Sequence, residues 1–181
     1  SYPAHLRELA DTYHSLVIAD ACHALGTVYE VEKMAHCVGS NAHSDLTTFS
    51  FHPVKTITTG EGGAITTEDP DLEKRLRLLC NHGIIRDPEE FQHHTLAHAS
   101  DGSINPWYYE LSQPGLNYRI SDLHCALGAS QLSRLPDIVR HRRALVSHYR
   151  SRLNQTGPLI RPLTAAEDCD DKHVKNALES R

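Results

Sequence analysis

The chain has 181 residues, of which 39% are hydrophobic and 23% charged, and its formal net charge is −5. This composition is typical of a soluble folded protein, and the length allows one ordinary domain but not two of full size. We expect no membrane or nucleic-acid partner, because no apolar run reaches the roughly 20 residues of a membrane helix, no secretory signal is present, and the basic residues are scattered.

The five cysteines are odd in number, widely spaced and free of any CxxC pair: Cys22, Cys37, Cys80, Cys125 and Cys169. Such a pattern indicates neither a disulfide framework nor a zinc site. We therefore expect reduced thiols and a cytoplasmic location.

The first half of the chain predicts one helix and three strands. Apolar residues at helical spacing predict a helix over residues 1–10. The short apolar run at 16–19, which ends at Asp20, is typical of a parallel strand that is buried on both faces. β-branched and aromatic residues predict two further strands at 47–51 and 64–67.

The second half predicts three helices and a long loop. A helix begins at the Asp-Pro pair of residues 69–70, and Gly83 follows its end. Residues 84–116 lack sustained periodicity and indicate a long functional loop. Two more helices are predicted at 121–135 and 136–154, so that the succession of strands and helices indicates an α/β protein.

The domain organisation follows from the same patterns. Residues 1–163 are expected to form one partial domain. The segment 164–181 is acidic and poor in apolar residues, and we expect it to be a poorly ordered tail.

Two segments carry side chains suited to chemistry. Asp20 stands at the carboxyl end of a predicted strand, where open α/β sheets bind ligands, although a turn or helix-cap role is an alternative. Lys55 lies among hydroxyls and the glycines of 60–63, which suit phosphate binding, and a desolvated lysine amine can form a Schiff base. An exposed lysine in a glycine-rich hairpin is an equal alternative from the residues alone.

A third segment places an amide and a guanidinium just ahead of a predicted helix cap. Asn117 and Arg119 precede Ser121. The planar fork of Arg119 could clamp an anion, or it could simply stiffen the turn at the surface.

Five segments share their order and chemistry with one known family. They are IADACHALG at 18–26, TFSFHPVK at 48–55, TGEGGA at 59–64, NHG at 81–83 and NYR at 117–119. Together they resemble the DegT/DnrJ/EryC1/StrS sugar aminotransferases, and within them the transaminases that make UDP-4-amino-4,6-dideoxy sugars. The resemblance implies part of the large domain of a fold-type I pyridoxal-phosphate enzyme, with three α/β/α layers and a mixed, mostly parallel sheet.

The resemblance also implies roles for single residues. Lys55 would form the Schiff base with pyridoxal phosphate, and Asp20 would pair with the pyridine nitrogen. His23 would lie against the cofactor ring and Ser50 would bind the phosphate. Asn117 would reach the phosphate from the neighbouring subunit of a homodimer.

The reaction implied by the resemblance is amino transfer in two half-reactions. The expected amino donor is glutamate, and the acceptor is a nucleotide-linked keto-6-deoxy sugar. The product would serve the biosynthesis of amino sugars and surface polysaccharides.

The sequence departs from the family pattern in three places. Cys22 stands where the family usually has alanine, and we interpret its thiol as a packing group. The segment 32–43 is longer than in relatives and indicates an enlarged surface loop. The family's earlier segment and its later small domain have no counterpart, so the chain resembles a fragment.

Three other interpretations remain open. The fragment could be a catalytically incompetent family member that acts as a binding or regulatory protein. His93, His94 and His98 lie close together and could bind a metal, but no carboxylate or cysteine completes the set and we expect no metal site. A sister class that dehydrates sugars carries a histidine in place of the lysine, and Lys55 disfavours it.

Overall fold

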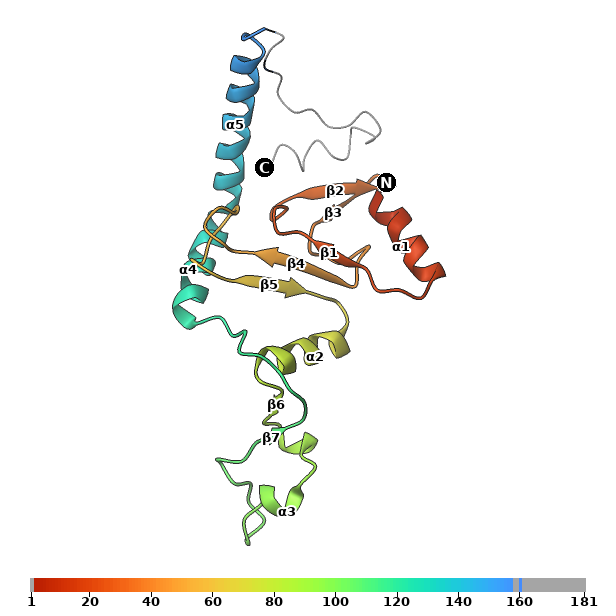
Figure 1. Cartoon of the computed structure of the whole chain (residues 1–181), viewed down its shortest axis with the longest axis vertical. Helices are drawn as coiled ribbons and strands as arrows, with labels where there is room; N and C mark the ends of the chain where they lie inside the picture. Colours follow the sequence, from red (N-terminus) through yellow and green to blue (C-terminus); the bar gives the residue numbers. More distant parts are fainter. Residues whose placement is uncertain (1, 158–159, 161–181) are drawn as a thin grey trace. The chain divides into compact units, whose positions relative to one another are not determined.

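The computed structural model describes residues 2–157 and 160 (Figure 1). The described chain falls into two compact units. The first contains the described residues up to Glu68 together with the described residues from Ser121 onward, and the second contains Asp69–Ile120. The predicted tail at 164–181 lies outside the described residues, so the proposed division at residue 163 stays a prediction.

A mixed three-stranded sheet forms the centre of the first unit. Its order is β1 (Ile18–Asp20), β4 (Leu46–Ser50), β5 (Gly63–Thr66). Strand β1 pairs with β4 in parallel and β4 pairs with β5 antiparallel. The three predicted strands are therefore confirmed, with ends shifted by one or two residues.

The burial predicted for the first strand is wrong. Leu16 and Ile18 expose 63% and 61% of their surface. Among the described residues, β1 is an edge strand with β4 as its one strand neighbour. Burial is concentrated in β4 instead, where Leu46, Thr47 and Phe49 are buried.

The segment predicted as an enlarged loop at 32–43 contains half of a β-hairpin, which corrects that prediction. Strand β2 (Val28–Val31) pairs antiparallel with β3 (Met34–Cys37). The two turn residues, Glu32 and Lys33, have φ angles of 50° and 69°. A two-residue turn with positive φ at both positions is the type I′ turn, whose twist matches that of the strands.

Aromatic rings hold this hairpin to the loop that follows it. The Tyr29 and His36 rings stack with centroids 5.4 Å apart, and His43 lies edge-on to both. The Tyr29 hydroxyl is hydrogen-bonded to His43 Nδ1 at 2.9 Å. These ring contacts add to the strand pairing in holding the hairpin.

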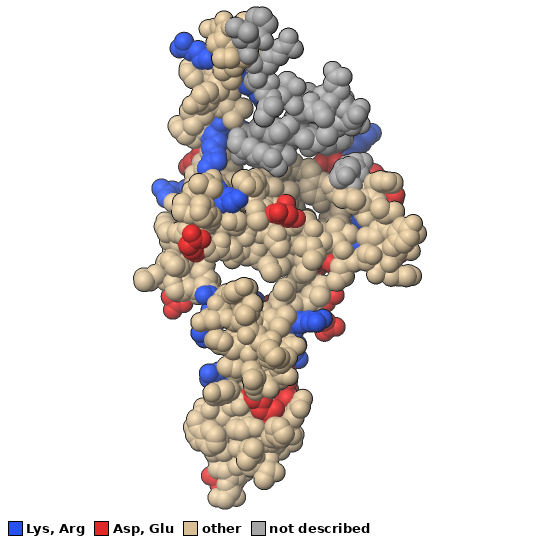
Figure 2. Space-filling model, in the orientation of Figure 1, with Lys and Arg blue, Asp and Glu red and all other residues tan. Residues whose placement is uncertain are grey.

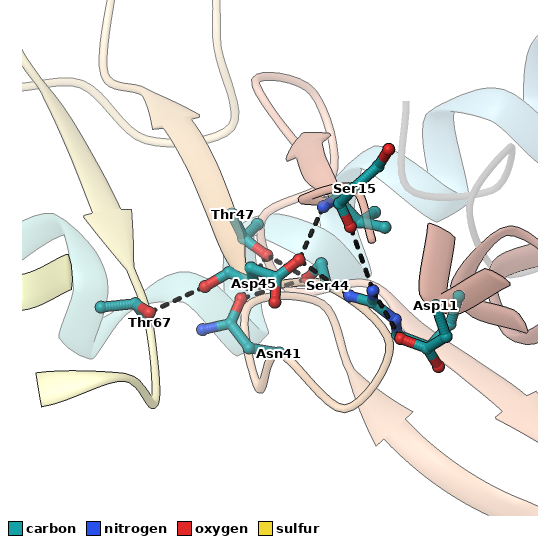
Figure 3. A network of polar contacts seen from close by, with 9 residues as sticks. Asp11, Ser15, Asn41, Ser44, Asp45, Thr47 and Thr67 are labelled. Atoms are coloured by element: carbon teal, nitrogen blue, oxygen red, sulfur yellow. Dashed lines mark hydrogen bonds and ion pairs between the residues drawn. The ribbon is translucent and has the colours of Figure 1, made fainter. Parts of the chain in front are cut away.

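Helix α1 (Tyr2–Thr12) is tied to the sheet by one carboxylate (Figure 3). Asp45 Oδ2 accepts hydrogen bonds from Arg7 Nη1 at 2.7 Å and from the Val17 N–H at 2.6 Å. The Thr67 hydroxyl donates to the Asp45 carbonyl oxygen at 2.7 Å. One residue thus joins α1, the start of β1, the start of β4 and the end of β5.

Helices α4 (Asp122–Ser133) and α5 (Leu135–Leu153) complete the first unit. The Ser121 side chain caps α4 by accepting from the His124 N–H, and Pro136 lies in the first turn of α5, as the sequence predicts. A Cβ on Gly128 would lie 2.8 Å from Thr59 Cγ2. Helix α4 therefore packs closely on the loop that follows Lys55.

The second unit begins with the predicted helix, α2 (Pro70–Cys80). The Asp69 side chain caps it by accepting from the N–H groups of Asp71 and Leu72, and the Gly83 N–H returns to the Leu78 carbonyl at 2.8 Å. Asn81 is the C-cap residue, so this last bond runs from the residue two positions past the C-cap to the third residue from the helix end, as in a Schellman motif.

The long loop predicted at 84–116 contains short elements. These are β6 (Ile84–Ile85), a 3₁₀ turn η1 (Pro88–Glu90), α3 (His94–Ala97) and β7 (Glu110–Leu111), with β6 and β7 antiparallel. Glu110 is buried, and its carboxylate accepts from the N–H groups of Gln92 and His93 and from the Tyr108 hydroxyl. This carboxylate orders a segment that has little periodic pattern.

The surface carries charges of both signs. On the face in Figure 2, lysine, arginine, aspartate and glutamate side chains are interspersed. In the part of the chain that the structure describes, no helix combines the length and apolar character needed to cross a bilayer.

Candidate active site

Three of the predicted site residues lie at or just beyond the carboxyl ends of two neighbouring parallel strands. Asp20 is the last residue of β1, and Ser50 is the last residue of β4. The pairing continues past β1, because the Ala21 N–H donates to the Thr48 carbonyl at 2.9 Å. Lys55 lies in the turn after β4, where its own N–H donates to the His52 carbonyl at 2.9 Å.

The amine of Lys55 contacts the imidazole of His23. Lys55 Nζ lies 2.7 Å from His23 Nε2, although the two residues are 32 positions apart. His23 follows β1 in the turn that also contains Cys22. The parallel pairing of β1 with β4 is what brings these two turns to the same edge of the sheet.

Asp20 is held as an anion beside this pair. Hydrogen bonds from Cys22 lower the pKa of Asp20 below its ordinary value, and the nearby charges of Lys55 and His23 lower it further. One of these bonds runs from the Cys22 N–H to Asp20 Oδ1 at 3.0 Å. The carboxylate is exposed, so it can still accept a bond from a ligand.

The Cys22 thiol is not set up as a nucleophile. Its hydrogen bond to Asp20 raises its pKa, and partial burial raises it further. Because the thiolate is the reactive form, the protonated thiol here is a poor nucleophile. This agrees with the interpretation of Cys22 as a packing residue.

The loop after Lys55 presents hydroxyls and glycines near the end of β4. Thr58 Oγ1 accepts from the Gly60 N–H at 2.9 Å, and Thr59, which is 1% exposed, donates from its hydroxyl to the Glu61 carbonyl at 2.8 Å. Gly60 has a φ of 86°, which other residues adopt with strain. Ser50 Oγ accepts from the His52 N–H at 3.4 Å, so that bond does not use its hydroxyl proton.

Asn117 belongs to the second unit. Its Oδ1 accepts from Arg119 Nε at 3.0 Å, and its main chain bridges to Asn81. The structure therefore brings Asp20, His23 and Lys55 together and places Ser50 on the adjoining strand. Asn117, and the anion clamp considered for Arg119, stay predictions.

The histidine-rich segment contains an i, i+4 pair. The rings of His94 and His98 lie 6.1 Å apart, and His98 Nδ1 is bonded to the His94 carbonyl at 2.9 Å. Within the described ranges, no group of three or more histidine, cysteine, aspartate or glutamate side chains is arranged to hold a metal ion.

The sequence model of the DegT/DnrJ/EryC1/StrS aminotransferase family matches residues 4–178. The chain belongs to this family. Among the family's curated proteins, it is 38% identical over 144 residues to a UDP-4-amino-4,6-dideoxy-N-acetyl-beta-L-altrosamine transaminase of Campylobacter jejuni, a match that covers 80% of this chain and 32% of the relative.

Solved structures of relatives share the fold. Helicobacter pylori PseC, described as an aminotransferase of pseudoaminic acid biosynthesis, gives a TM-score of 0.66 at 25% identity, covering 87% of this chain and 36% of that one. The PLP form of the putative sugar aminotransferase Spr1654 of Streptococcus pneumoniae gives 0.62 at 25% identity, covering 91% and 38%. The α/β class and the fold-type I relationship are thereby confirmed. The chain spans about a third of the length of these family members.

One contact to the candidate site involves a residue that no sequence motif marks. Arg142 of α5 donates from Nη2 to the Lys55 carbonyl oxygen at 2.9 Å. Arg140 and Arg143 stand beside it in the same helix, and no local pattern distinguishes the three. Only the tertiary contact identifies Arg142.

Proposed function

We propose that the chain carries the lysine-bearing half of the active site of a pyridoxal-phosphate aminotransferase. The observation that carries this proposal is the contact of Lys55 Nζ with His23 Nε2 beside the ionised Asp20. Family membership supports the same assignment.

The residues present fit pyridoxal phosphate. The site combines an amine, an imidazole and an exposed carboxylate on two adjoining turns, with hydroxyls and glycine main chain in the following loop. Lys55, His23 and Asp20 would hold the aldehyde, the ring face and the ring nitrogen. Ser50 would bind the phosphate. When bound, the cofactor supplies an electrophilic aldehyde and a ring that accepts electron density.

Lys55 and His23 are suited to moving a proton. Lys55 Nζ would serve as the nucleophile toward the aldehyde and as the base for a proton on the substrate carbon. His23 Nε2 lies within hydrogen-bond distance of that amine and can exchange a proton with it. The same contact holds the long lysine side chain at the end of the sheet.

Asp20 supplies a permanent negative charge. Because its pKa is lowered, it remains ionised at neutral pH. An anion beside a pyridine nitrogen favours the protonated form of that nitrogen. Asp20 can therefore hold a proton there while the Cys22 N–H fixes the direction of its carboxylate.

The substrates follow from the family. We propose that the whole enzyme transfers an amino group, from glutamate as the expected donor, to a nucleotide-linked keto-6-deoxy sugar. The similarity to the Campylobacter UDP-amino-sugar transaminase and to the Helicobacter aminotransferase of pseudoaminic acid biosynthesis supports this substrate class. We further propose a cytoplasmic homodimer in which Asn117 completes the phosphate site of its partner. The four described cysteines are free thiols, which agrees with a reducing compartment.

The test is covalent capture of the cofactor. The full chain is incubated with pyridoxal phosphate, reduced with borohydride and digested, and mass spectrometry locates the added mass. We expect the mass on Lys55 in the wild type and its loss in Lys55→Ala and Lys55→Arg. The arginine variant keeps the positive charge, so its failure would identify amine chemistry rather than charge as the requirement.

Lys33 provides the matched control. It is an exposed lysine of the same unit, at a positive φ that asparagine tolerates, so Lys33→Asn should capture cofactor like the wild type. Labelling spread over several lysines, or undiminished in Lys55→Ala, would contradict the proposal. Capture on Lys55 without amino transfer from glutamate would support the half-site assignment and leave the transfer reaction to the whole enzyme.

A further inference from the structure

Helix α5 reaches the main chain of the candidate active-site lysine. Arg142 Nη2 donates to the Lys55 carbonyl oxygen at 2.9 Å across 87 positions of sequence. Arg142 is half-buried, whereas Arg140 and Arg143 on the same helix are exposed. Arg140 pairs with Asp137 one turn away, as a surface residue does.

The same helix also packs against the turn that carries His23. Gly26 follows that turn with a φ of 81°, and a Cβ placed there would lie 3.3 Å from Leu135 Cδ2 and 3.4 Å from Val139 Cγ2. Leu135, Val139 and Arg142 are spaced three to four residues apart and so share one face of α5. One rigid helix face therefore contacts both of the segments whose side chains meet in the candidate site.

We propose that Arg142 is a positioning residue, which fixes the main chain of Lys55 so that its amine meets His23 and Asp20. This inference rests on the proposed function for the identity of the site. Arg142 touches none of the reacting groups. It acts through the Lys55 carbonyl. The packing of Leu135 and Val139 on Gly26 holds the turn that carries His23 at a fixed distance from the same helix.

The length of the lysine side chain makes the position of its main chain important. Four torsions separate the Lys55 main chain from Nζ, so a small rotation of the main chain is amplified at the amine. The Lys55 N–H is tied within its own turn to His52, and the hydrogen bond from Arg142 ties the carbonyl to a separate element. A charged donor makes this the stronger kind of hydrogen bond. Its loss frees the amine from His23.

The test uses three variants of the full chain. Arg142→Gln removes the positive charge and shortens the side chain, whereas Arg142→Lys keeps the charge but has a single donor group. Arg143→Gln is the matched control on the exposed face of the helix. Lys55 reactivity is read without cofactor, by brief acetic anhydride labelling and mass spectrometry, with Lys33 as the internal reference. Cofactor capture by borohydride is read in parallel, and thermal melting confirms folding.

We expect Arg142→Gln to raise Lys55 labelling about threefold relative to Lys33 and to slow cofactor capture about tenfold or more, because misplacement of a reacting group by about 1 Å has large effects on rate. Arg142→Lys should be intermediate, and Arg143→Gln should match the wild type. Unchanged labelling and capture in a folded Arg142→Gln, or equal changes in Arg143→Gln, would overturn the proposal.

Two further outcomes keep the test decisive. If Arg142→Gln does not fold, the comparison of Arg142→Lys with the wild type decides: labelling and capture that differ by about twofold support positioning, and identical values overturn it. If the proposed function itself is wrong, capture on Lys55 is absent in every protein, wild type included. Labelling of Lys55 then still reports whether Arg142 sets the position of the amine.

Discussion

One aspartate lies at each end of the paired strands β1 and β4. Asp45 immediately precedes β4, Asp20 ends β1, and the two carboxylates have different surroundings. At the amino ends, Asp45 exposes 28% of its side chain and accepts bonds from Arg7 and the Val17 N–H. At the carboxyl ends, Asp20 is exposed, accepts from the Cys22 N–H and faces the charges of Lys55 and His23.

The two ends of this strand pair serve different roles, one in stability and the other in the proposed chemistry. Both carboxylates have a lowered pKa, and in both a neighbouring main-chain N–H is among the causes. Asp45 uses its oxygens to join four elements of the fold, whereas Asp20 keeps part of its carboxylate accessible. The same residue type therefore serves structure at one end of the sheet and ligand binding at the other.

The largest expected effect is on activity, at the carboxyl ends. Asn at position 20 still accepts from the Cys22 N–H but brings no negative charge to a ring nitrogen. In the proposed whole enzyme, we expect Asp20→Asn to slow amino transfer from glutamate on the order of 100-fold, with the melting temperature unchanged. Stopped-flow absorbance of the cofactor-loaded protein measures the rate. An active Asp20→Asn variant would remove Asp20 from the proposed mechanism.

The next effect is on stability, at the amino ends. Asp45→Asn leaves the guanidinium of Arg7 without its half-buried anion, and we expect a loss of about 2 kcal/mol in the free energy of unfolding. Urea titration followed by circular dichroism measures it. Asp11, which also pairs with Arg7 at 2.7 Å, is more exposed, so Asp11→Asn should cost less. Equal losses in the two variants would contradict the central role given to Asp45.

The smallest effect is the pH dependence of that difference. The Val17 N–H and Arg7 lower the pKa of Asp45 in the folded chain. A group with a lowered pKa contributes stability above its unfolded pKa of about 3.9 and loses that contribution as the pH falls through the folded pKa. The gap between wild type and Asp45→Asn should therefore narrow below about pH 4, and a gap that stays constant down to pH 2 would refute the linkage.

Local signals in the sequence predict the four longer helices of the described chain, α1, α2, α4 and α5, but not the short helix α3. An aspartate cap and a proline mark the start of α2, and a serine cap marks the start of α4. The three strands of the central sheet are predicted by a short apolar run and by β-branched and aromatic residues, and sequence motifs single out Asp20 and Lys55. In each case the prediction depends on the conformational preference or the chemistry of the residue types themselves.

What the sequence did not reveal depends on contacts between distant residues. The β2–β3 hairpin was missed because Glu32 and Lys33 lack the Asn-Gly chemistry of a type I′ turn. The exposure of Ile18 depends on which strands lie beside β1, and the contact of Arg142 depends on the packing of α5. None of these can be read from a local pattern.

The turn at Glu32 and Lys33 has one more consequence. Its backbone takes up a conformation that neither residue favours, and the rings of Tyr29, His36 and His43 hold the strands on either side. The strand pairing, rather than the turn residues, sets the conformation of the hairpin tip. It is therefore a natural point at which to introduce a reporter group or a short peptide without changing the register of the two strands.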